Sequence, residues 1–192
     1  MPRTKSFDPA EVLDRAADLF WARGYESVSI QDLVDHLGLS RSSLYETFGD
    51  KQHLYLAALD RYRRAAGGRM LADLNASSPK AGIRRHFERM MQEALDQHGR
   101  WGCFMTNATI ERGPLDPETD AVTQASRDAM IAAFEQTIRR AQRAGEIPKA
   151  KNALALARFL AGAVYGLRTL ARSGAGRPTL ADFVNVTIGA LD

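Results

Sequence analysis

Apolar residues recur along this chain at the spacing of three to four positions that marks helices buried on one face. The first such segment has apolar side chains at Leu13, Ala16, Ala17 and Phe20. Asp8-Pro9 precedes it as a capping residue and a proline suited to the first helical turn. Sustained apolar–polar alternation and Asn-Gly or Asp-Gly hairpin turns do not occur. The pattern therefore predicts an all-α fold.

Glycine-rich and polar breaks divide the chain into about nine predicted helices. The first three are short and closely spaced, and a longer fourth helix follows them. The expected ranges are 9–24, 29–38, 40–48, 51–74, 80–97, 103–111, 117–144, 150–173 and 179–191.

The second and third helices, joined at Gly38, have the form of a helix-turn-helix. Leu33, Leu37 and Leu44 occupy positions where the two helices bury side chains against each other. The opposite face of the third helix has only small or polar residues, which allows it to enter the major groove of DNA. These outward residues are Arg41, Ser42, Ser43, Glu46 and Thr47.

Residues flanking this face suit phosphate contacts, since helix N-termini, hydroxyls and lysine bind anions. The predicted DNA-contacting set is Ser29, Ser40, Arg41, Ser42, Ser43, Tyr45, Thr47 and Lys51. Bulk charge does not support this prediction, because residues 1–64 hold nine Lys/Arg and ten Asp/Glu. A purely structural helix pair, with Ser40 only a cap, stays open on periodicity alone.

Residues 19–59, LFWARGYESVSIQDLVDHLGLSRSSLYETFGDKQHLYLAAL, resemble the N-terminal domain of the TetR/AcrR family of transcriptional regulators. The resemblance lies in the order and spacing of Gly24-Tyr25, Gly38-Leu39-Ser40, Ser43-Leu44-Tyr45 and Asp50-Lys51. Thr47 departs from the family pattern, in which histidine is common, and this puts one phosphate contact in doubt.

The resemblance implies a homodimer on double-stranded DNA with a palindromic operator. It also implies release of that operator when a small-molecule inducer binds. The expected domains are a helix-turn-helix DNA-binding domain over residues 1–50 and a ligand-binding and dimerisation domain over residues 51–192.

The last two predicted helices are the candidates for a four-helix dimer interface, because small and apolar residues alternate along them. Ala161, Gly162 and Gly166 allow close helix approach, and Leu167 adds apolar area. The alternative is that these residues form a core within one chain.

Methionine and aromatic residues of the C-terminal half are the candidates for an adaptable ligand pocket. For each of them, ordinary core packing is the alternative. They are Phe87, Met90, Met91, Trp101, Cys103, Phe104, Met105, Phe134, Phe159 and Tyr165.

Cys103 is the only cysteine and stands near the start of a predicted helix, where the helix dipole favours a thiolate. A Gly-Cys here also resembles a subset of the family that includes repressors sensing electrophiles or oxidants. Two hypotheses stay open: an electrophile or redox sensor, and a small packing residue.

Other features of the sequence limit the remaining classes of function and location. The N-terminus lacks the apolar segment of a signal peptide, and Arg158 and Arg168 interrupt the longest apolar stretch, so we expect a cytoplasmic protein without a membrane partner. The four histidines lack the spacing of metal ligands, and we expect no metal or cofactor. An α-helical enzyme or scaffold is the rival class, but no catalytic spacing supports it.

Overall fold

The computed structural model describes residues 7–96 and 101–192, and every regular element in these ranges is helical. The prediction of an all-α fold with about nine helices is confirmed for this part of the chain. The helices are α1 (Pro9–Arg23), α2 (Ile30–Leu37), α3 (Arg41–Phe48), α4 (Lys51–Leu74), α5 (Pro79–Leu95), α6 (Phe104–Glu111), α7 (Pro117–Arg143), α8 (Ala153–Arg172) and α9 (Arg177–Gly189), with a 3-10 turn, η2 (Gly113–Leu115).

Local capping signals explain where the helices begin. Ser29 and Asp32 form a reciprocal capping box at α2, and Gly38 ends that helix in the left-handed conformation with φ of 68°. The largest departures from the predicted starts lie in the last two helices. Asn152 caps α8, so the helix begins at Ala153 instead of residue 150. Pro178 lies in the first turn of α9, which begins two residues before the predicted start.

Buried side chains form two hydrophobic cores. The N-terminal core joins α1, α2, α3 and the first half of α4, and it also includes Phe104 of α6. The C-terminal core joins the end of α4 to α5, α7, α8 and α9 around Phe87, Ile138 and Leu160. A domain boundary after residue 50 stays a prediction, because α4 contributes Leu54 to one core and Leu74 to the other.

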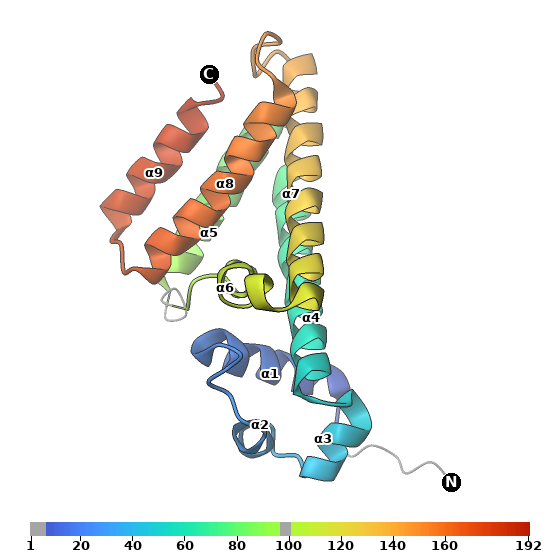
Figure 1. The fold of residues 1–192 in the computed structure, drawn as a ribbon. Helices are drawn as coiled ribbons and strands as arrows, with labels where there is room; N and C mark the ends of the chain where they lie inside the picture. The colour runs from blue at the N-terminus through green and yellow to red at the C-terminus, as the bar shows by residue number, and fades with distance from the viewer. Residues whose placement is uncertain (1–6, 97–100) are drawn as a thin grey trace.

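The molecule is elongated, with α1, α2 and α3 at one end and the C-terminus at the other (Figure 1). α4 runs from this end into the helical body, and α6 lies between the end and the body. We call α1, α2, α3 and the first turns of α4 the reading head.

Among the described helices, α8 alone is long and apolar enough to cross a membrane. A single such helix is weak evidence for a membrane span, because buried core helices have the same length and composition. Core packing accounts for much of its apolar character, since Ala157, Leu160 and Leu167 are buried in the C-terminal core.

Candidate functional site

The third helix presents a polar face to solvent at the tip of the molecule. Its inner residue Leu44 is fully buried, whereas Arg41, Ser42 and Glu46 are exposed and Tyr45 is 42% exposed. Arg41 makes no ion pair with the described residues, so its guanidinium is available for an external partner. Ser43 and Thr47 are half-buried at the edges of this face.

The two predicted serines at helix starts act as caps in the free protein. The Ser40 hydroxyl accepts from the Ser43 N–H at 3.1 Å and lies 3.0 Å from the Ser42 hydroxyl. At α2, the Asp32 carboxylate accepts from the Ser29 N–H at 2.8 Å. A phosphate at this helix start would therefore meet the N–H groups of Ile30 and Gln31.

Lys51 has a neighbour that sequence reasoning missed. Its Nζ lies 4.1 Å from the centroid of the Tyr25 ring, which also lies 3.8 Å from the Arg112 guanidinium carbon. Arg112 donates to Glu26 and to Gln52, both at 2.8 Å. Burial lowers the pKa of Lys51. The C-terminal end of α6 is thus bonded to the reading head through Arg112.

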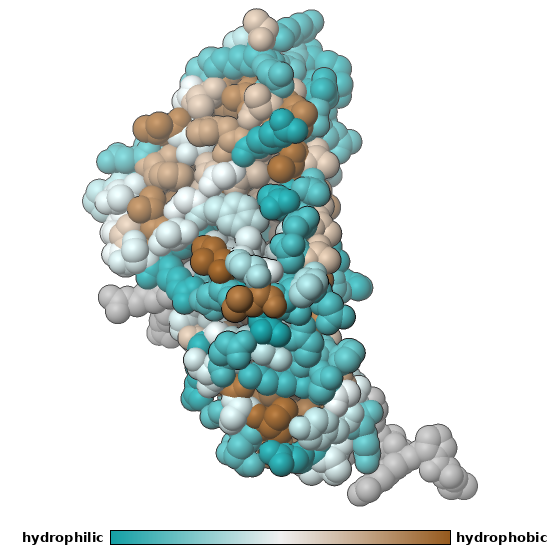
Figure 2. Space-filling view, viewed as in Figure 1, coloured by the Kyte–Doolittle hydropathy of each residue, from teal (hydrophilic) through white to brown (hydrophobic). Residues whose placement is uncertain are grey.

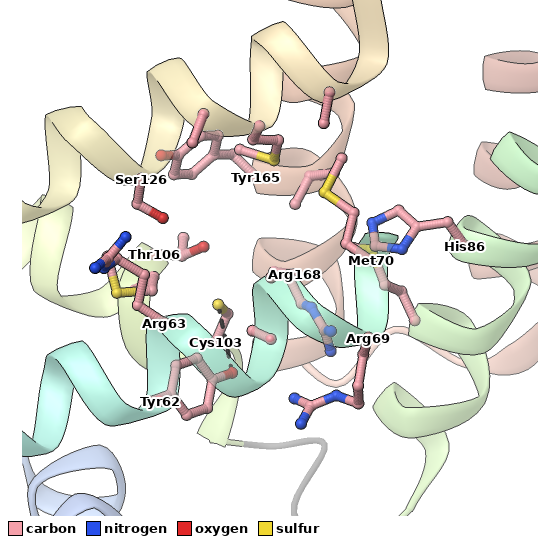
Figure 3. Close-up of a pocket in the computed structure, with 18 of the residues that line it drawn as sticks. Tyr62, Arg63, Arg69, Met70, His86, Cys103, Thr106, Ser126, Tyr165 and Arg168 are labelled. Atoms are coloured by element: carbon pink, nitrogen blue, oxygen red, sulfur yellow. Dashed lines mark hydrogen bonds between the residues drawn. The ribbon is translucent and has the colours of Figure 1, made fainter. Parts of the chain in front are cut away.

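A cavity of about 190 Å³ lies among α4, α5, α6, α7 and α8. Figure 3 shows Tyr62 and Cys103 on one side of it, with Ser126 and Tyr165 opposite. The structure brings four of the ten predicted pocket residues to its wall: Met90, Cys103, Met105 and Tyr165.

The other six predicted pocket residues do not line this cavity. Phe87 and Phe134 stack in the C-terminal core, and Met91 packs against that core. Phe104 packs on Tyr55 and Tyr62 in the N-terminal core. The Trp101 ring contacts Trp21 of α1 at a centroid distance of 5.6 Å. Phe159 points outward and is 46% exposed.

The arginines and the histidine of the cavity wall were absent from the sequence-based set. They are Arg63, Arg69, Arg89, Arg168 and His86. One signal was available in the sequence: Arg168 interrupts an apolar helix, and a charge on an apolar face needs a buried partner or a cavity.

Cys103 is the N-cap residue of α6 and is half-buried in the cavity wall. The Tyr62 hydroxyl donates to its Sγ at 3.6 Å (Figure 3). Burial raises the pKa of Tyr62 well above its ordinary value, which keeps the phenol protonated as a donor. Any reagent that enters the cavity therefore meets this sulfur.

Within residues 7–96 and 101–192, no group of three or more His, Cys, Asp and Glu side chains could hold a metal ion.

An exposed helix-turn-helix joined through one long helix to a separate helical body defines a class: the DNA-binding transcriptional regulators. Comparison with known families agrees. The sequence profile described as bacterial regulatory proteins, tetR family, matches residues 12–58. The profile described as tetracyclin repressor-like, C-terminal domain, matches residues 79–183.

Full-length relatives extend this similarity. The uncharacterised regulator YezE of Bacillus subtilis (strain 168) is 35% identical over 194 residues and 100% of both chains. The transcriptional repressor ComR of Escherichia coli (strain K12) is 33% identical, covering 97% of this chain and 90% of its own. The chain therefore belongs to the TetR family. Because its relatives are transcriptional regulators, it is a regulator and not an enzyme.

Among solved structures, a cysteine mutant of the TetR family regulator CifR, bound to 26-base-pair operator DNA, has a TM-score of 0.87. It is 28% identical, with 99% of this chain and 100% of that chain covered.

Proposed function

We propose that the protein is a cytoplasmic, homodimeric repressor that binds a palindromic operator and leaves it when a small-molecule inducer occupies the cavity. The position of α4, which reaches from the reading head to the cavity, is the main support for this proposal. The helix begins beside Tyr25 in the reading head, and its later residues Tyr62, Gly67 and Met70 line the cavity. A ligand that shifts this wall therefore acts on a helix that also supports α3.

The exposed face of α3 supports direct reading of DNA. Arg41 suits bidentate contact with guanine, and Ser42 and Tyr45 are placed for shorter polar contacts. CifR, with the same fold, binds operator DNA, and ComR is a repressor. Those two properties belong to the relatives and support the same role for this chain.

The outward face of α8 and α9 supports the dimer. Figure 2 shows apolar and pale side chains gathered over these helices. Phe159 and Val186 are 46% and 74% exposed. Apart from its chain neighbours and its own helix backbone, a Cβ added to Gly162 or Gly189 would meet no atom within 4 Å. Glycine in the middle of a helix weakens it, so close approach of a second copy explains Gly162, and Gly189 at the end of α9 leaves room for the same approach.

Ala161 and Gly166 have a different role from the one predicted for them, and two other alanines of α8 share that role. Ala157, Ala161 and Ala163 are buried within the chain, and a Cβ at Gly166 would approach the Phe183 ring to 3.0 Å. These four positions serve packing inside one chain. The proposed interface therefore rests on Phe159, Gly162, Val186 and Gly189.

Two helices connect the cavity to the reading head in this proposal. α4 does so directly, and α6 contributes Cys103, Met105 and Thr106 at one end and is followed by Arg112 at the other. Displacement of α6 by a ligand would strain the Arg112 contacts with Glu26 and Gln52. The inducer then favours a spacing of the two reading heads that no longer fits DNA.

Selection of bound duplexes from a random-sequence pool tests the operator geometry. The selected duplexes should contain an inverted repeat. The protein should bind either half-site more weakly when the other half-site is scrambled. A single unrepeated site, bound as tightly as the repeat, would contradict the dimeric reading.

A second candidate is favoured by the position of Cys103. Its sulfur faces the cavity and accepts from Tyr62, so an alkylating inducer could form a carbon–sulfur bond there, with the carbon–leaving-group bond broken and the leaving group and the thiol proton released to solvent. Fast labelling of the native protein by iodoacetamide, with operator loss absent in Cys103→Ser, is the expected result. Labelling only after denaturation would exclude this candidate and leave non-covalent induction intact.

A further inference from the structure

We infer that the cavity accepts a small organic anion, a carboxylate carried on a compact apolar body. The inference names the ligand class of the proposed inducer site, and it rests on the proposed function only for the effect on DNA.

Positively charged side chains line the cavity, and the carboxylates paired with them lie outside its lining. Four arginines line it, and no aspartate or glutamate does: Arg63, Arg69, Arg89 and Arg168. Their partner carboxylates Asp60, Asp73 and Glu93 lie outside the lining. Four positive charges thus face three negative ones, and Asp60 is also shared with Arg64 outside the wall. The wall retains a positive excess that attracts an anion.

Arg168 is the guanidinium best placed to bind a carboxylate. Its side chain is 13% exposed, and its Nη2 donates to Glu93 at 2.7 Å. Its Nε and Nη1 groups have no hydrogen-bond partner among the described residues, so either N–H can donate a charge-assisted hydrogen bond to a carboxylate. Burial opposes its charge, but Cys103, Tyr62 and Glu93 outweigh burial and raise the pKa of Arg168.

Glu93 cannot neutralise this site alone, because three arginines share it. Arg89, Arg168 and Arg69 all form ion pairs with its carboxylate, the last at 3.9 Å. Burial by itself would raise the pKa of Glu93, but these arginines lower it, so the carboxylate is fully ionised at neutral pH. Its single negative charge is divided among neighbours that together carry three positive charges.

The rest of the wall is apolar or uncharged. Met70, Met90, Met130 and Val164 offer adaptable apolar contacts, and Thr106 and Ser126 offer hydroxyls. His86 is neutral at pH 7, because burial lowers its pKa to about 4. A cationic ligand would find no carboxylate in the wall, and a neutral one would leave the free Arg168 donors unsatisfied.

Calorimetry and thermal-shift assays on the full-length protein test this inference with matched probes. Straight-chain carboxylates from acetate to octanoate, and benzoate, are compared with the primary amides of the same skeletons at about 10 mM. At least one carboxylate should bind about 10-fold or more tightly than its amide, since a charge-assisted bond exceeds a neutral one.

Arg168→Gln should abolish that preference, while Arg139→Gln, which changes an exposed ion pair on α7, should retain it. Arg168→Gln leaves Glu93 paired with Arg89. If the single variant does not fold, the double variant with Arg168→Gln and Glu93→Gln provides a second test of the same preference. Amides that bind as tightly as their acids, or a panel in which no carboxylate binds, would overturn the inference.

Operator binding, followed by fluorescence anisotropy in the same samples, separates the two proposals. A carboxylate that binds selectively without releasing DNA upholds the anion site and contradicts the release mechanism. Acids and amides that bind alike and release DNA uphold release and contradict the anion site.

Discussion

Arg41 is the single residue on which base reading depends most. Its side chain is exposed on α3 and lacks an ion-pair partner among the described residues. We predict that Arg41→Ala weakens operator binding by about 1–3 kcal/mol and relaxes preference at one base pair of each half-site. Competition between the operator and random duplexes measures both effects. Equal losses of affinity for the operator and for random duplexes would show that Arg41 contacts a phosphate instead of a base.

His86 gives the protein a pH-dependent stability. It lies against Asp73 and Arg89, and burial, more than any charge, lowers its pKa from 6.5 to about 4. Between these values the unfolded chain binds a proton that the folded chain does not. Stability is therefore retained above pH 6.5 and falls as pH drops towards 4, by about 3 kcal/mol for this residue.

Urea unfolding at a series of pH values measures this loss. His86→Gln, which cannot titrate, is the control for all other ionisable groups and should lose less stability over the same window. Parallel curves for the two proteins would show that His86 titrates normally in the folded state.

Residue roles were predictable where they depend on local geometry. Ser29 and Ser40 were expected at helix starts, and both cap helices. The cavity wall was predicted less well, because an apolar residue such as Phe134 can reach a core or a pocket with the same periodicity. Arg168 was visible as a charge in an apolar helix, but its partner Glu93 lies 75 positions away in sequence.

At the scale of elements, α4 contains a segment of low local helix stability beside the cavity. Gly67 and Gly68 lie in the middle of this helix, and a Cβ at either would meet nothing within 4 Å. Packing therefore does not require them. We predict that Gly68→Ala raises the free energy of unfolding by about 0.5–1 kcal/mol and slows amide exchange in this part of α4.

The reciprocal change Ala72→Gly, one turn further along an exposed face of the same helix, is the control. It should lower stability by a similar amount. A destabilised Gly68→Ala protein would instead show that the glycine relieves a strain in α4.

Helix boundaries were predicted well because caps act within a few residues. Asp116 and Pro117 start α7 as expected, with the Asp116 carboxylate accepting from the Thr119 N–H. The division of α4 between two cores was not predictable, since it depends on which distant helices cover Leu54 and Met70.

At the scale of the whole molecule, the dimer is tested by adding charge to the outward face of α8 and α9. We predict that Gly162→Arg or Val186→Arg gives folded monomers in sedimentation and loses high-affinity operator binding. Ala161 and Leu167 are unsuitable for this test, because both are buried within the chain and their substitution would disturb the fold.

Leu115→Arg is the matched control for Val186→Arg, because both side chains are 74% exposed and Leu115 lies in η2 instead of α8 or α9. This control should stay dimeric. A wild-type monomer at micromolar concentration that still binds a palindrome tightly would contradict the dimer.

Occupation of the cavity should release the operator, and the only cysteine, Cys103, allows the cavity to be filled without knowledge of the inducer. Methanethiosulfonates attach a group to Cys103 as a mixed disulfide, with methanesulfinate leaving. Operator affinity is measured for the methyl and benzyl adducts, with Cys103→Ser treated alike as the control. The benzyl adduct should bind the operator about 5- to 150-fold more weakly than the unmodified protein, and the methyl adduct should lose much less affinity. Fully benzylated protein that binds the operator as tightly as the unmodified protein would contradict release of the operator through the cavity.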